Sequence, residues 1–426
     1  MIQAVKVQLE KQGWLCIHID LSREKNYSFK DLIYNILQYS GQEATGNPDL
    51  KIPKKSGFLI SQRIIKEYKH EKKILILADE TDSLNEDSVK QFFEEVIPAV
   101  KDGLSIADKS IQLRTIFAGR YISQWEQLCS KTTLKPMSLT PFDFSAVYQT
   151  VGQFASENKL ELRPEYKQQF ASHLMYFTGG YPGCMAEILG NDMGLPVEEI
   201  VSKEIEYYKT IVKPVIDEIK VHIPDSLKEA FNIFSVVRRC NTTLLQQFID
   251  KGMIEWSGSV HDLEDALTRT YLVNREDGFI KDDITRRLLA IHMRQKNQSD
   301  FIRICKKTIS IYESWLKSPM AVRPAIAAIE LFFQKLQYYY FFFNKEVVVE
   351  KRRQQAVNDL NDILEKLAFE RDSYTIISVF KDAFTNDWEL RFTINYLLRD
   401  DIYDNDHPYN ELLSEINEFH KKLRSG

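Results

Sequence analysis

The stretch Ile74-Leu75-Ile76-Leu77-Ala78-Asp79-Glu80 decides the fold of this chain. Its five apolar residues are typical of a strand buried on both faces, as occurs in a parallel sheet that helices cover. The two carboxylates that follow mark the end of that strand, because charged side chains are rarely buried without partners. The stretch therefore predicts a parallel sheet in which a buried strand delivers Asp79 and Glu80 to the carboxyl edge.

The residues around this strand alternate between strand and helix patterns, which indicates an α/β fold with crossover helices. We expect strands at 14–21, 73–78, 113–118 and 135–139, and helices at 1–12, 29–39, 59–70, 86–100 and 122–130. Beyond Pro141 the pattern is helical, with helices expected at 144–158, 164–177, 182–189 and 197–209. This order favours a helical lid that follows an α/β core.

A third pattern begins after Pro214 and Pro224, which mark a predicted linker. We expect helices at 226–237, 242–250 and 260–270, then a hairpin of strands 271–273 and 279–281. Three helices and a hairpin are the elements of a winged helix. The remaining sequence is predicted to be helical. Four domains are therefore expected: an α/β core (1–140), a lid (141–212), a winged helix (213–295) and a helical C-terminal region (296–426).

Composition limits the class of protein. The 426 residues exceed the size at which one core keeps growing, so more than one domain is expected. The net charge of −5 gives no overall attraction to nucleic acid or to anionic lipid. The five cysteines are widely spaced and form no Cys-x-x-Cys pair, which argues against a disulfide framework or a zinc site. With no membrane-spanning segment in the sequence, we expect a cytoplasmic protein.

The carboxylates at the strand end suit the hydrolysis of a phosphate anhydride. That reaction needs a divalent cation, a carboxylate that orients water, and positive charge near the phosphates. Asp79 suits the metal, through a coordinated water, and Glu80 suits the base. Arg120 follows the next strand, where it would sense a terminal phosphate. The structural alternative is that these are solvated charges that cap turns.

A glycine-rich turn, Thr178-Gly179-Gly180-Tyr181-Pro182-Gly183, joins two predicted helices. Its glycines permit positive φ and a close approach of the backbone to a ligand. Pro182 suits the first turn of a helix and would lie against an adenine. The alternative is a plain break between helices.

In this order, the motifs resemble the STAND class of signal-transduction ATPases, within the AAA-type P-loop superfamily. The resemblance makes 74–80 the Walker B strand, 118–120 the sensor after the fourth strand, and 180–182 the GxP element. It continues through Ser226–Met293 as the winged helix. The implied fold is a P-loop NTPase core of α/β type with a helical lid, a winged helix and a C-terminal helical region.

The resemblance also implies the cofactors, ATP or ADP with Mg²⁺, and the roles of the site residues. Glu80 and Arg120 would be catalytic, Asp79 would hold Mg²⁺, and Gly180 and Pro182 would contact the nucleotide. The implied function is a nucleotide-dependent signalling switch that reaches a protein partner through its C-terminal helices. Assembly into a homo-oligomer is compatible with this class, and no membrane association is expected.

One departure from the family pattern matters. No Gly-x-x-x-x-Gly-Lys-Ser/Thr phosphate loop occurs in the sequence, and the resemblance places the first strand and this Walker A loop before Met1. The absent strand would lie between 113–118 and 135–139. Two interpretations stay open: the chain is truncated at its N-terminus, or it is a relative that has lost nucleotide binding.

Two other functions stay open as alternatives, a nucleotide-independent interaction scaffold and a DNA-associated regulator. The scaffold is favoured by the missing phosphate loop. Contact with DNA is disfavoured because the third helix of the predicted winged helix carries Asp262, Glu264 and Asp265, which would repel phosphates. Basic residues nearby are few: Arg238, Arg239 and Lys251. Nucleic acid is therefore not the expected partner.

The missing phosphate loop leads to a prediction about affinity. We expect the 426-residue chain to bind Mg·ATP weakly, because the loop's backbone amides and lysine normally bind the β- and γ-phosphates. Isothermal titration calorimetry tests this directly. A dissociation constant in the micromolar range would refute the expectation.

Overall fold

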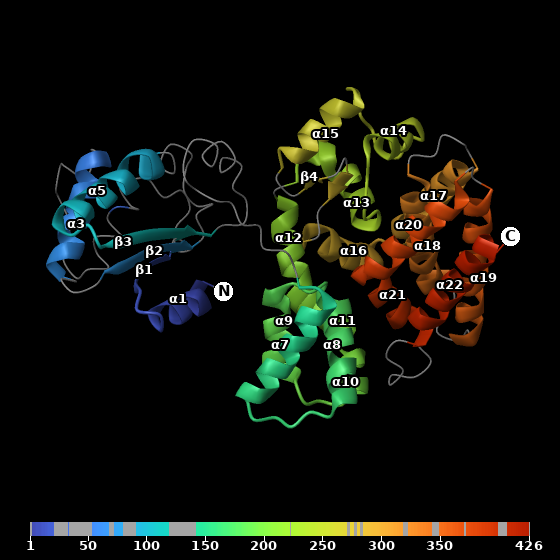
Figure 1. The fold of residues 1–426 in the computed structure, drawn as a ribbon, viewed down its shortest axis with the longest axis horizontal. Coiled ribbons are helices and arrows are strands. Elements are labelled where there is room, and N and C mark those ends of the chain that lie inside the picture. Colours follow the sequence, from blue (N-terminus) through green and yellow to red (C-terminus); the bar gives the residue numbers. More distant parts are fainter. Residues whose placement is uncertain are drawn as a thin grey trace. The chain divides into compact units, whose positions relative to one another are not determined.

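The computed structural model describes most of the chain, and Figure 1 shows its fold. The described residues are 2–20, 33, 53–67, 72–79, 91–118, 142–221, 223–270, 273–276, 279–281, 284–317, 323–342, 349–369, 372–398 and 407–425. They are mostly helical, with one small parallel sheet and one hairpin. The chain divides into two compact units, residues 1–138 and 139–426.

The first unit is built on three parallel strands, β1 (Leu15–Asp20), β2 (Lys73–Asp79) and β3 (Gln112–Phe117), in the order β1-β2-β3. The register aligns the last residues of β1 and β2 with each other, and the first residues of β2 and β3. The predicted parallel sheet is confirmed for these strands. Since β2 is hydrogen-bonded on both sides, it is the inner strand.

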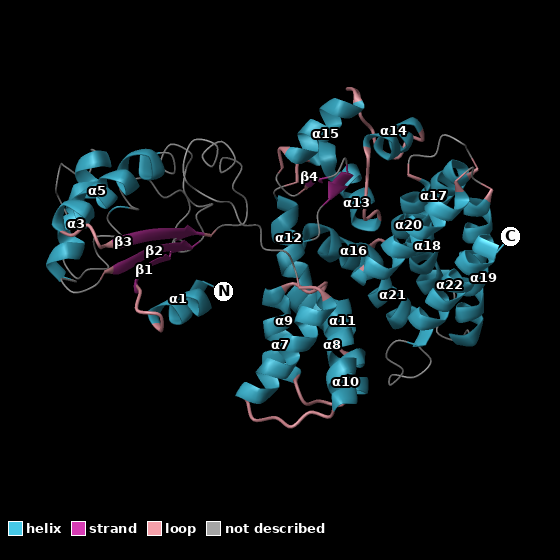
Figure 2. Ribbon diagram, in the orientation of Figure 1, coloured by secondary structure: helices cyan, strands magenta, loops and turns pink. Residues whose placement is uncertain are grey.

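Helices cover both faces of this sheet (Figure 2). On one face, α1 (Ile2–Glu10) brings Leu9 to a small cluster that contains Leu75 and Leu77. On the other face, Ile74 and Ile76 belong to the main core, to which the helices α3 (Pro53–Glu67), η3 (Phe92–Val96, a π-helix) and α5 (Ile97–Ala107) contribute. Alternate residues of β2 therefore enter opposite cores, as the pleat of a strand requires.

Two helices of this unit differ from the prediction. Helix α3 begins at Pro53, inside the predicted loop, because proline fits the first turn of a helix. Helix α5 runs past the predicted end at Val100 to Ala107. It passes through Gly103, where a Cβ atom would lie 2.0 Å from the Ser61 hydroxyl of α3, so the glycine permits the close packing of the two helices. The predicted helices 29–39 and 122–130 and strand 135–139 lie outside the described residues, apart from Ile33.

The second unit begins with helices, as predicted after Pro141, and their role as a lid stays a prediction. They are α7 (Phe144–Glu157), α8 (Pro164–Thr178), α9 (Pro182–Asp192), α10 (Val197–Ser202), α11 (Glu204–Tyr207), η4 (Tyr208–Val212, a π-helix) and α12 (Lys213–Val221). The prediction of a linker at Pro214 is wrong, because the π-helix η4 continues directly into α12 at Lys213 and Pro214 lies within this helical run.

The next elements are η5 (Asp225–Leu227, a 3-10 turn), α13 (Lys228–Val236), α14 (Thr242–Asp250), α15 (Val260–Thr268), β4 (Asn274–Glu276), β5 (Phe279–Lys281) and α16 (Ile284–Lys296). The strands pair antiparallel, with Glu276 opposite Phe279. The first strand is thus three residues later than predicted, which leaves the Asp277-Gly278 pair between the strands; this dipeptide is typical of two-residue hairpins. The designation as a winged helix stays a prediction.

The rest of the unit is a helical bundle of α17 (Gln298–Leu316), α18 (Pro324–Phe342), α19 (Val349–Ala368), α20 (Ser373–Asn386), α21 (Trp388–Leu398) and α22 (His407–Ser425) (Figure 2). Phe332, Phe380 and Phe384 are fully buried within it. Within the described part of the chain, no helix is long and apolar enough to cross a bilayer. The four-domain division of the sequence stays a prediction.

The burial of β2 predicts how mutations affect the first unit. Replacing Ile76, which has no exposed surface, with alanine should lower the stability of the unit by about 2–5 kcal/mol, the usual cost of emptying a core site. Ile116, on the neighbouring strand, is 37% exposed, and Ile116→Ala is expected to cost clearly less. Hydrogen exchange of peptides from β1 and β2 measures the difference. Equal effects of the two substitutions would contradict the packing described here.

Candidate functional site

The carboxyl edge of the parallel sheet gathers acidic residues. Asp79 ends β2, and the register places it opposite Asp20, which ends β1. On the other side, the Ala118 N–H donates to the Ala78 carbonyl at 2.9 Å, so the chain that leaves β3 passes beside the end of β2. Ligands of open parallel sheets bind at this edge. The backbone therefore brings two aspartates and the start of the segment 118–120 together.

The structure describes only part of the predicted site at the sheet edge. Glu80 and Arg120 lie outside the described residues, and of Asp79 only the backbone is described. By chain connectivity, Glu80 follows Asp79 directly and Arg120 comes two residues after Ala118. Their catalytic roles stay predictions.

The donors at this edge fit Mg²⁺. This cation usually takes one or two protein carboxylates and fills its other positions with phosphate oxygens and water. Asp20 and Asp79 supply that number. Among the described side chains, no group of three or more His, Cys, Asp or Glu residues forms a metal cluster. Two carboxylates at the sheet edge would leave coordination positions of Mg²⁺ open for phosphate oxygens and water.

The predicted nucleotide contacts Gly180 and Pro182 lie in the second unit, at the turn between α8 and α9. Gly179 and Gly180 have φ angles of 63° and 77°, so the predicted positive φ is confirmed. The Phe142 N–H donates to the Gly180 carbonyl at 3.0 Å, and a Cβ atom on Gly180 would lie 2.3 Å from the Phe142 carbonyl oxygen. Gly180 is therefore required for packing against Phe142. Pro182 begins α9, as expected, and its contact with an adenine stays a prediction.

Arg238 was expected to contribute basic surface to the predicted winged-helix segment, and this expectation is wrong. This residue is only 7% exposed, and its guanidinium donates to Glu330 and to Asp387, each at 2.9 Å. It also lies over the Phe333 ring. Burial alone lowers the pKa of Arg238, but the two carboxylates outweigh it and raise the pKa above its usual value. The partners follow in the sequence by about ninety and one hundred and fifty residues, so local spacing gave no sign of them.

The acidic residues of α15 also have structural roles. Glu264, expected to face a DNA groove, is 2% exposed and accepts a hydrogen bond from the Thr242 hydroxyl at 2.6 Å. Asp262 and Ser259 form a capping box at the start of the helix. Asp265 is exposed. Of the three carboxylates expected to repel DNA, one is thus buried, and the expectation was wrong for it.

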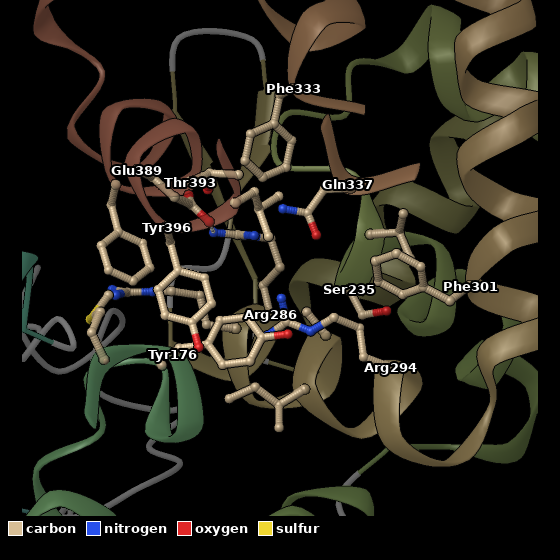
Figure 3. A pocket seen from close by; sticks show the side chains of 18 residues that line it. Tyr176, Ser235, Arg286, Arg294, Phe301, Phe333, Gln337, Glu389, Thr393 and Tyr396 are labelled. Carbon is tan, nitrogen blue, oxygen red and sulfur yellow. Dashed lines mark hydrogen bonds and ion pairs between the residues drawn. The ribbon is translucent and has the colours of Figure 1, made fainter. Parts of the chain in front are cut away.

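The second unit contains a cavity of about 60 Å³ that the sequence analysis missed (Figure 3). Its lining includes Arg286, Arg287 and Arg294 of α16 and Glu389 of α21. One terminal nitrogen of Arg286 donates to both oxygens of Glu389, at 2.7 and 2.6 Å. Burial raises the pKa of Glu389, but Arg286 and other arginines nearby outweigh this and lower it to about 2. The carboxylate is therefore charged at neutral pH.

Aromatic rings position the other two guanidinium groups of this cavity. The Arg287 guanidinium lies over the Trp388 ring at 4.9 Å and donates to the Phe142 carbonyl at 3.0 Å. Arg294 lies over the Tyr176 ring at 4.6 Å, and Tyr176 stacks on Tyr396 with ring centroids 4.2 Å apart. The signal available in the sequence was the spacing of Arg286 and Arg294, eight residues apart on one helix face. Nothing local linked them to Glu389.

A buried histidine links two helices beside this region. The Lys220 ammonium donates to Nε2 of His292 at 2.6 Å, and Nδ1 of His292 is 2.7 Å from the Tyr208 hydroxyl. Burial, followed by the charge of Lys220, lowers the pKa of His292 to about 4. Burial also raises the pKa of Tyr208 to about 12. Because ammonium only donates, Nε2 accepts and the proton of the neutral ring lies on Nδ1.

Comparison with solved structures gives a weak likeness. The chain is similar to the Walker-type ATPase Paby2304 of Pyrococcus abyssi, with 12% sequence identity, coverage of 67% of this chain and 86% of that chain, and a TM-score of 0.44. A likeness at this level carries no argument about fold or activity. No family model and no curated protein match the chain.

His292 makes the second unit sensitive to pH. Its folded pKa of about 4 lies below the usual value of 6.5, so the unfolded chain binds the proton first as the pH falls. The contribution of the neutral His292 ring to the stability of the second unit is therefore complete above about pH 6.5. It decreases as the pH falls towards 4, by up to about 1.4 kcal/mol for each pH unit. Thermal unfolding between pH 7 and pH 4.5 measures the loss, which His292→Gln should reduce.

The matched control is His407→Gln, because His407 is exposed at the start of α22. This variant should keep the pH dependence of the natural chain. If His292→Gln and the natural chain lose stability in parallel, His292 does not cause the dependence.

Proposed function

We propose that this chain is an ATPase-like module of the P-loop type that acts as a nucleotide-dependent signalling switch. The observation that carries the proposal is the end of β2, where Asp79 follows five fully buried apolar residues and lies opposite Asp20 at the carboxyl edge. A buried parallel strand that ends in carboxylates is suited to hold a cation beside phosphates.

The proposed roles follow from the order of these residues along the edge. Asp79, with Asp20 beside it, would hold Mg²⁺, which when bound neutralises phosphate charge. Glu80 would accept the proton of the attacking water, and Arg120 would contact the terminal phosphate, where negative charge develops. Gly180 and Pro182, in the helical unit, would contact the nucleotide.

The backbone contacts of Phe142, at the start of the second unit, support the proposal of a switch. Phe142 lies just before α7, and both of its backbone polar groups are held: its N–H by Gly180 and its carbonyl by Arg287. A displacement of the chain at Phe142 therefore acts directly on the turn after α8 and on α16. Hydrolysis would reset this position, and the C-terminal helices would carry the change to a protein partner.

A nucleotide-independent scaffold is the second candidate. Buried ion pairs already hold the helical unit together, since Arg238, two residues after α13, pairs with Glu330 of α18 and with Asp387 before α21. Such a unit needs no nucleotide to keep its shape. A DNA-associated regulator is less favoured, because Arg238 is not available on the surface.

Thermal unfolding with and without Mg·ATP tests the proposed function. With a dissociation constant of about 1 mM, about 5 mM Mg·ATP should stabilise the first unit by about 1 kcal/mol, which raises its melting temperature by a few degrees. Asp79→Asn should remove the part of the shift that needs Mg²⁺. Glu80→Gln should keep the shift and abolish any phosphate release.

Asp102→Asn serves as the matched control, because Asp102 is exposed on α5 and lies away from the strand ends. It should respond to Mg·ATP as the natural chain does. If neither the natural chain nor any variant responds, while all of them remain folded, the nucleotide proposal fails and the scaffold stands.

A further inference from the structure

The polar side chains that line the cavity of the second unit differ in whether the protein itself satisfies them. Arg286 pairs with Glu389, and Arg287 donates to the Phe142 carbonyl. The Ser235 hydroxyl donates to a backbone carbonyl of its own helix, α13, at 2.6 Å. The charged groups among these have partners within the protein, so a ligand of this cavity need not carry a charge.

Two further polar side chains line the cavity, Gln337 of α18 and Thr393 of α21. They are only 8% and 7% exposed. Within the part of the chain that the structure describes, neither side chain makes a hydrogen bond. A polar group that is buried without a partner is costly, because it has lost the hydrogen bonds that water would give it. A molecule that hydrogen-bonds to both side chains therefore stabilises the folded unit.

Gln334, one turn earlier on α18, shows how a buried amide is usually satisfied in this unit. It has no exposed surface, and its Nε2 donates to the Val236 carbonyl at 2.8 Å. Gln337 has the same side chain on the same helix, but its amide is directed towards the cavity (Figure 3). The cavity therefore contains a planar group that can both donate and accept a hydrogen bond.

The rest of the wall is mostly apolar, and much of it is aromatic. The aromatic residues that line the cavity are Tyr176, Phe301, Phe333, Phe392 and Tyr396. A buried water needs about two to four polar partners, and the amide and hydroxyl described above supply these for one or two waters only. A ligand with one polar edge and apolar ring faces therefore matches this wall better than water does.

The size of the cavity limits the ligand to about one ring. A water molecule needs about 10–15 Å³ of the same kind of volume, so about 60 Å³ corresponds to roughly four to six waters. This is the scale of one six-membered ring with its substituents. Arg294 and Tyr396 also line the cavity and are half-buried, so a ligand reaches it from this side.

We propose that this cavity is a binding site for a small neutral heterocycle in which an N–H and a C=O lie side by side, as in a pyrimidine base. Such an edge pairs with the Gln337 amide through two hydrogen bonds, one in each direction, as glutamine side chains pair with the edges of bases. The ring faces contact the aromatic wall, and the Thr393 hydroxyl binds a further polar atom of the ring. The site lies wholly in residues 139–426 and does not depend on the sheet edge or on the binding of ATP.

Thermal unfolding of the full chain at pH 7.5 tests the proposal, with uracil as the probe. With a dissociation constant of about 1 mM, about 10 mM uracil should raise the melting temperature of the second unit by a few degrees. The effect should saturate. 1,3-Dimethyluracil keeps the ring but has no N–H, and it should have much less effect. Uridine distinguishes a site for the free base from a site for the base end of a nucleoside.

Gln337→Leu is the decisive variant. It should weaken uracil about five- to tenfold and remove the preference for uracil over 1,3-dimethyluracil, because the paired hydrogen bonds are lost. Without ligand, it should keep or raise the melting temperature, because an apolar group of similar size replaces an amide that makes no hydrogen bond. Thr393→Val should act in the same direction. Ala290→Met, which fills the cavity, should abolish binding, and it keeps the test decisive if Gln337→Leu fails to fold.

Gln334→Leu and Gln354→Leu are the matched controls. Gln334→Leu removes the hydrogen bond to the Val236 carbonyl, so it should lower the melting temperature but leave uracil binding unchanged. Gln354 is exposed on α19, and its replacement should change neither quantity. Asp79→Asn should bind uracil as the natural chain does, which separates this site from the proposed nucleotide site.

Three results would overturn the site. The first is a natural chain whose melting temperature does not respond to uracil, which would mean that the cavity holds water only. The second is equal binding of uracil by Gln337→Leu and the natural chain. The third is an equal loss of stability in Gln337→Leu and Gln334→Leu, since the Gln337 amide would then serve the fold rather than a ligand.

Discussion

The first unit depends on one constraint, the burial of β2 on both faces and between two strands. Residues 74–78 have at most 1% exposed surface, so none of these positions tolerates an unpaired charge. The first place where this strand can carry a carboxylate at little cost is its carboxyl end, which is Asp79. The same parallel register brings the end of β1 to this point, so the fold of the sheet, rather than a loop, fixes where acidic residues meet.

The second unit is stabilised differently. Its helices are joined by buried charged groups as well as by apolar packing: Arg238 with Glu330 and Asp387, and Arg286 with Glu389. Such pairs contribute little net stability compared with apolar packing, but removing one partner leaves a buried charge and is costly. Their geometry therefore specifies how the helices meet around the cavity that residues of α8, α16 and α21 line.

The sequence was informative wherever local patterns determine structure. Strand β2 and helix α14 follow from short apolar patterns, and Gly179 and Gly180 from the need for positive φ. Helix ends were less predictable where packing against another element, rather than local sequence, determines where the helix stops. Gly103 resembles a helix break, yet α5 continues through it because the missing side chain lets α3 approach.

The cavity shows the limit of local patterns in physical terms. Arg286 and Glu389 are separated by about one hundred residues, and their approach depends on how α16 and α21 pack. Arg238 appeared to offer basic surface because its carboxylate partners are also distant in the sequence. For the sheet edge, the sequence predicted that the strand delivers Asp79 to the carboxyl end, whereas the Asp20–Asp79 register needed the structure. The roles of Glu80 and Arg120 stay predictions from their chemistry and from the resemblance. The Phe142 backbone joins two contacts of this kind, because its N–H donates to the Gly180 carbonyl and its carbonyl accepts from Arg287, a wall of the cavity. A shift of Phe142 therefore reaches both the turn after α8 and helix α16, although these elements are far apart in the sequence.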